Sequence, residues 1–236
     1  MNTGAGPSPV AQSRKRRWDE LNKVLDANRE SKRQEDNEPT VGHSYVKWRQ
    51  IAGFFPVVVG PVVGDSHSGT VLPDELLTAL HMYLSYASIC FFGMFIEGNE
   101  STRVHFIAPI IMIVCSFFKG RIKILAEEQI EGNRVHAHGH FEFVLKRGTK
   151  RICIVEAKKD DILQGRTQCL VGCESLCDVE DLAVTYGIAT NYLEWCFLKN
   201  EADQITEELL TISLHNGKPT AGSLRVIANK IISILE

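Results

Sequence analysis

HFEFVLKRGTKRICIVEAKKD, residues 140–160, is the stretch that decides the fold, because two alternating apolar segments flank the polar turn Arg147-Gly148-Thr149-Lys150. This pattern predicts an antiparallel hairpin of two strands. Side chains alternate across a strand, so Ile154, Glu156 and Lys158 share one face. The second strand therefore carries a carboxylate and an amine to the end of a segment that otherwise reads as core.

The sequence around this hairpin predicts an α/β fold, with a mixed β-sheet flanked by helices. The predicted helices span residues 74–92, 99–120 and 160–177, followed by a terminal helix with Leu224, Ile227, Ile231 and Leu235 at helical intervals. The inner face of the third helix is expected to consist of Leu163, Leu170, Cys173 and Cys177. The predicted strands span residues 121–131, 134–146, 151–158, 186–190 and 194–198.

The hairpin brings a second carboxylate to the same place. Glu142 lies on the first strand at a position that can face Glu156 on the second. Two carboxylates held close together repel, and each raises the pKa of the other unless a cation neutralises them. Mg²⁺ (or Mn²⁺) prefers carboxylate oxygens, and Lys158 beside it can orient an attacking water or stabilise the charge that develops on a phosphate.

These residues resemble the PD-(D/E)XK, or restriction-endonuclease-like, nuclease superfamily. The resemblance covers about residues 99–198 and includes the triplet Glu156-Ala157-Lys158. The segment Gly139-His140-Phe141-Glu142-Phe143 is similar to the acidic strand of that superfamily, with Glu in place of Asp. The resemblance implies a restriction-endonuclease-like fold and a metal-dependent phosphodiester hydrolase that acts on DNA.

The resemblance also assigns roles to residues outside the hairpin. Gln164 and Gln168 correspond to the glutamine-bearing helix of many such nucleases, and Glu100, with Arg103, to the acidic residue of their first helix. The implied catalytic residues are Glu142, Glu156, Lys158, Gln164, Gln168 and Glu100, with Glu142 and Glu156 as the metal ligands. We expect phosphate contacts from Lys146, Arg147, Lys150, Arg151 and Lys159.

Residues 139–174 also look like the nuclease-like C-terminal domains of Crinkler effectors. This likeness implies an effector that acts on nucleic acid, either in a nucleus, including that of a host cell, or in the cytoplasm.

Two other functions stay open at this stage. The first is a nuclease fold without turnover that serves as an interaction or nucleic-acid-binding module. The second is a zinc-dependent hydrolase built on His136, His138 and His140, which fall on one strand face. Cys169, Cys173 and Cys177 are spaced along one helix face, where we expect buried thiols rather than a metal site.

The N-terminal part differs in character from the rest of the chain. Residues 1–33 carry eight Lys/Arg and four Asp/Glu, so residues 34–236 carry the other eighteen and twenty-five. Residues 1–40 contain few large apolar side chains, which predicts a disordered basic tail followed by a single domain over residues 41–236. The basic clusters Arg14–Arg17 and Ser31–Arg33 favour binding of a nuclear-import receptor.

The same sequence argues against secretion signals and membrane spans. The first twenty residues lack the apolar segment of a signal peptide, and the apolar run Phe106–Phe118 is shorter than the roughly 20 residues that cross a bilayer. The seven cysteines have no disulfide-framework spacing, which favours a reducing compartment. The sequence does not indicate an oligomeric state.

Overall fold

The computed structural model of the chain describes residues 9–32, 41–63, 69–91 and 99–236. Its helices are α1 (Pro9–Lys32), the 3₁₀ turn η1 (His43–Tyr45), α2 (Trp48–Ile51), α3 (Asp74–Cys90), α4 (Glu100–Phe117), α5 (Ile162–Glu180) and α6 (Ala221–Leu235). Its strands are β1 (Val41–Gly42), β2 (Val57–Val59), β3 (Ile122–Glu131), β4 (Ala137–Arg147), β5 (Lys150–Ala157), β6 (Thr185–Thr190), β7 (Glu194–Asn200), β8 (Ile205–Thr211), β9 (Leu214–His215) and β10 (Lys218–Pro219).

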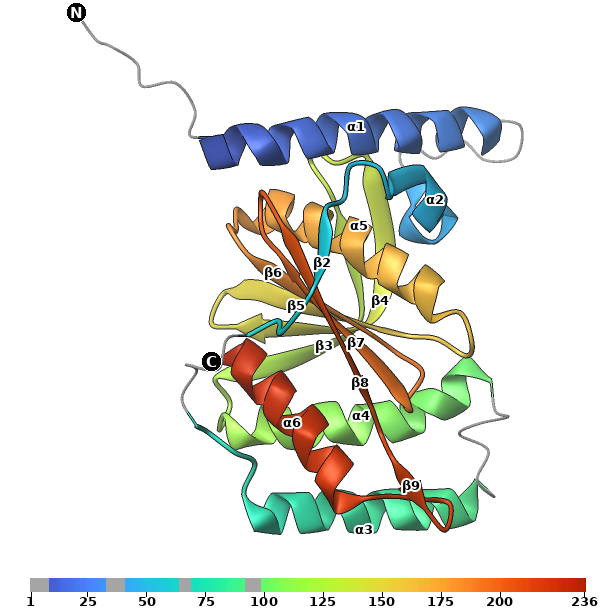
Figure 1. The fold of residues 1–236 in the computed structure, drawn as a ribbon, viewed down its shortest axis with the longest axis vertical. Helices are drawn as coiled ribbons and strands as arrows, with labels where there is room; N and C mark the ends of the chain where they lie inside the picture. Colours follow the sequence, from blue (N-terminus) through green and yellow to red (C-terminus); the bar gives the residue numbers. More distant parts are fainter. Residues whose placement is uncertain (1–8, 33–40, 64–68, 92–98) are drawn as a thin grey trace, which may run out of the picture.

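Eight strands form one mixed sheet, in the order β1-β4-β5-β6-β7-β8-β2 with β3 paired to β4. Strands β5 and β6 are parallel and are joined through α5, whereas β3, β4 and β5 form an antiparallel meander. Helices α1, α2 and α5 lie on one side of the sheet, and α3, α4 and α6 lie on the other (Figure 1). The predicted α/β fold with a mixed sheet and flanking helices is confirmed.

Both faces of the sheet are covered, so the core consists of two layers. One layer packs sheet residues such as Val155 and Phe197 against Phe106 and Ile110 of α4 and against α6. The other packs Val144 and Ile154 against α5. Strand β5 is therefore apolar on both faces, as its sequence requires.

Helix α4 shows how local sequence sets an element's limits. The Asn99 side chain accepts a hydrogen bond from Thr102 N at 2.9 Å and caps the helix N-terminus. By length and composition alone, α4 is apolar enough to cross a membrane, but in this fold it packs against α3, α6 and the sheet and buries Phe106, Ile110 and Val114. The apolar run that begins at Phe106 therefore lies in a buried helix of the core.

Two expectations about the later elements need correction. The sequence places Leu163 on the inner face of α5, but this side chain is 49 % exposed. The first turn of α5 is only partly buried, and the continuous buried part of the helix begins at Thr167. The sheet also does not end near residue 198. Strand β8 pairs antiparallel with β7, and β2 then pairs in parallel with β8.

The largest correction concerns the N-terminal part of the chain. Residues 9–32 form the continuous helix α1, which packs across α5 (Figure 1). Trp18, Leu21 and Leu25 are buried, and their spacing along the helix gives it a narrow apolar stripe. The prediction of a disordered tail is wrong for these residues, because overall composition conceals three well-placed apolar side chains. Residues 1–8 and 33–40 lie outside the described part.

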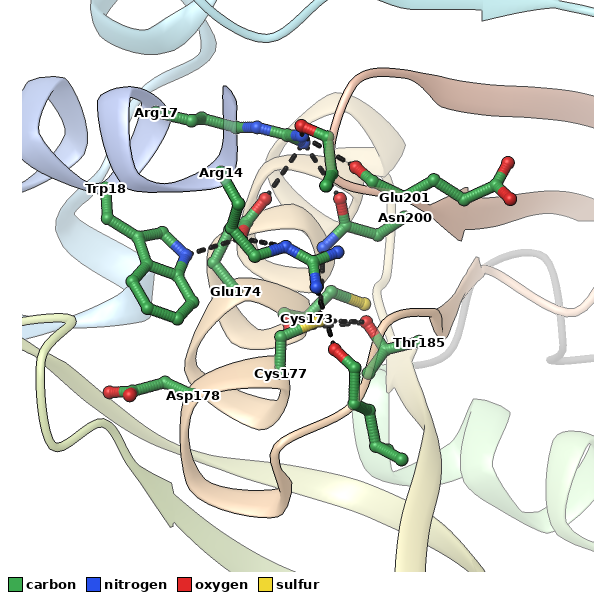
Figure 2. Close-up of polar contacts among 12 residues, drawn as sticks. Arg14, Arg17, Trp18, Cys173, Glu174, Cys177, Asp178, Thr185, Asn200 and Glu201 are labelled. Carbon is green, nitrogen blue, oxygen red and sulfur yellow. Dashed lines mark hydrogen bonds and ion pairs between the residues drawn. The ribbon is translucent and has the colours of Figure 1, made fainter. Parts of the chain in front are cut away.

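Polar side chains of α1 also hold the helix against α5. Glu174 of α5 is fully buried, and Figure 2 shows Arg14, Arg17 and Trp18 of α1 directed toward it. Arg17 lies 2.9 Å from Glu174 Oε1, and Trp18 Nε1 donates to Oε2 at 2.6 Å. Arg17 also donates to Asn200 Oδ1 at 2.9 Å.

Arg14 extends this attachment to the loop after α5. Its two terminal nitrogens donate to the carbonyl oxygens of Leu182 and Ala183 at 2.7 and 2.8 Å. Half of the predicted import cluster Arg14–Arg17 is thus engaged within the fold, and a receptor could bind all four residues only if α1 left α5.

Replacing Arg17 by Met should destabilise the protein by about 3 kcal/mol, because it leaves the buried Glu174 carboxylate without its nearest counter-ion. The matched control is Lys15→Met, which removes an exposed cation paired with Asp19 and should cost no more than about 0.5 kcal/mol. Urea unfolding followed by circular dichroism measures both. Equal, small effects would mean that α1 does not pack as described.

Candidate active site

The register of the hairpin sets two carboxylates opposite each other. Phe143 pairs with Val155 and Val144 with Ile154, so one further step places Glu142 across from Glu156. The Ala157 backbone N–H donates to Glu142 Oε2 at 3.0 Å and fixes that carboxyl group at the strand edge. The predicted approach of Glu142 to Glu156 is therefore present in the structure.

Lys158 lies between these carboxylates and a third acidic residue. Its Nζ is 2.8 Å from Glu156 Oε1 and 3.5 Å from Glu100 Oε1. Glu100 is brought here by α4, which begins one residue after its cap Asn99. Four of the six predicted site residues therefore gather at the carboxyl end of β5.

Burial shifts the pKa values of the charged residues in this group. Glu156 is only 3 % exposed, and its burial, reinforced by the charge of Glu142, raises its pKa to about 8 despite the nearby Lys158. Burial likewise raises the pKa of Glu142. Burial lowers the pKa of Lys158, but the charges of Glu156, Glu100 and Glu142 outweigh this and leave it above its ordinary value.

One atom of the site has no hydrogen-bond donor. Among the described residues, none donates an N–H to the buried Glu156 Oε2, and the neighbouring Glu142 carboxyl group can hydrogen-bond to Glu156 only when one of the two is protonated. A buried carboxylate oxygen costs free energy unless it is hydrogen-bonded or neutralised. A proton shared with Glu142, or a cation between the two carboxylates, would meet this need.

The site lies in a notch of the sheet. On one edge of β4, Ala137 and His138 pair with β1, and β5 pairs only from Phe143 onward. The short turn η1 lies beside the intervening part of β4, where His43 approaches Gly139 so closely that a methyl group there would lie 2.5 Å from its Nδ1. The interruption between β1 and β5 gives Glu142 an edge without a strand partner.

The two predicted glutamines behave differently. Gln164 does not face the carboxylates: its amide donates to the carbonyl oxygens of Ser44 and Val46, both at 3.0 Å. Gln168 is buried on α5, one turn after Gly165. A methyl group at Gly165 would lie 2.8 Å from Lys158 Cγ, so this glycine lets the lysine lie against the helix.

Sequence reasoning missed the part played by Gly165 and by the arginine of α4. Arg103 is buried, donates to the carbonyl oxygen of Asn191 at 2.7 Å and lies 3.5 Å from Asp160. One helical turn after Glu100, it thus holds α4 against the connection between β5 and α5. The charge pattern Glu100/Arg103 facing Lys158/Asp160 is a signal that the sequence contained.

The expected phosphate contacts need a correction. Arg147 and Lys150 pair at the turn of the β4–β5 hairpin, which is the end of β5 remote from Glu156. Glu156 is six residue steps along the strand from Lys150, or roughly 20 Å. Lys146 and Arg151 belong to the same remote end, where Arg151 lies 3.1 Å from Glu128. Lys159 alone of the five lies beside the site.

The histidine strand does not converge on a metal site. His136 Nδ1 lies 3.0 Å from Asp26 of α1, and His140 Nδ1 lies 3.3 Å from the carbonyl oxygen of Glu127. Within the described ranges, no group of three or more His, Cys, Asp or Glu side chains is arranged to hold an ion.

The two carboxylates nevertheless fit a hard divalent cation. Mg²⁺ is commonly held by one or two carboxylates, with water and substrate phosphate completing its shell. The unsatisfied Glu156 Oε2, opposite Glu142, is where such a charge is needed.

Comparison with known proteins adds one relative. No family model matches the chain. The chain is 39 % identical over 223 residues to Crinkler effector protein 5 of Phytophthora infestans. This match covers 94 % of the chain and 62 % of that protein. The chain thus spans about three fifths of the length of this curated relative, whose name identifies it as an effector and specifies no reaction. The expected similarity to Crinkler effectors is found, and membership of the PD-(D/E)XK superfamily stays a prediction.

The raised pKa of Glu156 predicts how stability depends on pH. Because the folded-state pKa of about 8 exceeds the ordinary 4.5, the folded protein binds more protons than the unfolded chain between these values. This contribution to stability is fully present below pH 4.5 and is lost as the pH rises through 8. Without divalent cations, Glu156→Gln should therefore melt near the wild type at pH 5 and progressively above it toward pH 9.

The control for this measurement is Glu131→Gln, which neutralises an exposed carboxylate on β3 and should show no such widening gap. Thermal melts in EDTA across this pH range decide the matter. A variant that melts increasingly below the wild type at high pH would show that Glu156 is a charged partner in a stabilising ion pair.

Proposed function

We propose that this chain is a metal-dependent nuclease that hydrolyses phosphodiester bonds of DNA and works as an effector. The observation that carries the proposal is the pair Glu142 and Glu156, which lie opposite each other; Glu156 is buried with Oε2 unsatisfied, and Lys158 Nζ lies 2.8 Å from its other oxygen. An ion pair between Glu156 and Lys158 does not involve the Glu142 carboxyl group, which the Ala157 N–H holds at the same edge of the strand.

Glu142 and Glu156 would hold the cation, Mg²⁺ or Mn²⁺. When bound, the ion supplies the positive charge that lowers the pKa of water and polarises a phosphate oxygen. Lys158 would then be free to orient the attacking water or to stabilise the charge that develops on the phosphate. Glu100, at 3.5 Å from Lys158 Nζ, keeps the amine protonated and directed into the site.

The effector role rests on the relative named Crinkler effector protein 5. We propose that this chain acts inside a host cell, because the relative is named an effector. Action in the nucleus would require α1 to leave α5 before an import receptor could bind the whole basic cluster, because Arg14 and Arg17 are buried against α5.

A second function is supported by a specific contact. The short distance between Lys158 and Glu156 is also what a structural ion pair at the end of a strand would show. In that case the fold would serve as an interaction or nucleic-acid-binding module without turnover.

Substitution within the site separates the two functions. Glu156→Gln and Lys158→Met should each reduce Mg²⁺-dependent cleavage of plasmid DNA at least about 100-fold, since each removes a charge that acts on the reacting phosphate. Only Glu156→Gln should also weaken Mn²⁺ binding, measured by calorimetry, because Lys158 is not a ligand.

The matched control is Lys123→Met, which removes an exposed amine on β3 at the end of the sheet remote from the site and should keep cleavage within a few-fold of the wild type. RNA assayed beside the plasmid identifies the preferred nucleic acid. Wild-type protein that cleaves neither substrate, or site variants that still cleave, would favour the module without turnover.

A further inference from the structure

We infer that the segment Tyr45–Arg49 is a binding surface for single-stranded nucleic acid, set beside the candidate active site. This inference rests on the proposed function for its substrate class and deepens it. We call these five residues the rim segment. They place the exposed cations Lys47 and Arg49 next to the aromatic rings of Tyr45 and Trp48, in a body with an excess of acidic residues.

The exposure pattern of the rim segment alternates. Tyr45 is 49 % exposed, and Lys47 and Arg49 are exposed, whereas Val46 is fully buried and Trp48 is partly buried. Buried Val46 anchors the segment while its neighbours project outward. Cations that contact phosphates and aromatic faces that stack on bases are the two components of surfaces that bind single strands.

Side chains of α5 and α1 hold the rim segment in a fixed position. Gln164 of α5 donates to the carbonyl oxygen of Val46, and Lys47 Nζ lies 3.1 Å from Gln164 Oε1. The Arg166 guanidinium lies over the Trp48 ring at 4.2 Å from its centroid. From the other side, Gln50 accepts from Lys47 N at 2.8 Å and itself donates to Asn28 of α1.

The same turn of α5 connects the rim segment to the candidate active site. Gln164 contacts the rim segment, and the next residue, Gly165, abuts Lys158. On the other side, the Tyr45 ring lies against Gly42 of β1, the strand that borders the notch containing Glu142. A strand that crossed the rim segment would therefore pass the turn of α5 that contacts Lys158.

The charge of the rim segment favours an anionic occupant. Residues 41–63 contain Lys47 and Arg49 and no acidic residue, although residues 34–236 carry more Asp and Glu than Lys and Arg. The nearby exposed acids have structural partners: Asp160 lies 3.5 Å from Arg103, and Asp161 caps α5 by accepting from Gln164 N. A single strand is the expected occupant, because the exposed Tyr45 ring can stack only on bases that are not already stacked in a duplex, whereas one face of Trp48 is covered by Arg166.

The test is binding without cleavage. Fluorescence anisotropy in EDTA, with short labelled single strands of DNA and of RNA and a duplex of the same sequence, compares the full-length protein with Lys47→Gln/Arg49→Gln and with Tyr45→Ala. The double variant should lower the slope of log K against log salt by about 1.4, from two phosphate contacts at roughly 0.7 each. Tyr45→Ala should weaken binding about fivefold or more and leave the slope unchanged.

The control is Lys119→Gln/Lys123→Gln, which removes two exposed cations at the start of β3, the end of the sheet remote from the site. It should bind single strands like the wild type. Circular dichroism melts confirm that each variant is folded.

The outcomes separate the rim segment from the proposed function. Binding that is absent, that prefers the duplex, or that the rim variants and the control weaken equally would overturn the rim segment, whether or not the protein cleaves DNA. Protein that binds single strands through these residues but never cleaves with Mg²⁺ would leave the rim segment standing and remove the nuclease.

Discussion

The opposition of Glu142 and Glu156 is the constraint on which the rest of this structure depends. The register of β4 and β5 sets the two carboxyl groups opposite each other, and the burial of Glu156 limits their screening by water. The burial of Glu156, reinforced by the charge of Glu142, outweighs the nearby Lys158 and raises the pKa of Glu156 to about 8. A site that must acquire a further positive charge to relieve its own repulsion is suited to a divalent cation.

Helix α5 connects this site to the other parts of the molecule. Gly165 lets Lys158 lie against its first turn, and Gly172 admits the Phe141 ring, which would lie 2.3 Å from a methyl group at that position. Gln164 holds the rim segment, and buried Glu174 binds α1. The buried, polar middle of α5 is thus explained by partners on both sides, one of them a helix from the far N-terminus.

Much of the fold followed from short-range sequence patterns. The hairpin, the helix capped by Asn99 and the approach of Glu142 to Glu156 depend on alternation, turns and caps, all of which are local. What failed depended on distant partners. Helix α1 is stable because Arg17 reaches Glu174 across 157 positions of sequence, and composition alone cannot show such a contact.

The site residues divide in the same way. Glu142, Glu156 and Lys158 were found because strand geometry relates them, whereas the role of Gln164 depends on η1, which the sequence did not predict. The basic residues of the hairpin turn are close to the site in sequence, which is why they were expected there. They lie far from it in space, because an extended strand separates the turn from Glu156.

The most direct test of the central claim is a crystal structure of the wild-type protein grown with Mn²⁺, examined by anomalous scattering. We predict a single strong peak between the carboxylates of Glu142 and Glu156, within about 2.0–2.3 Å of an oxygen of each. Density that lacks a peak there, with Lys158 still paired to Glu156, would contradict the account.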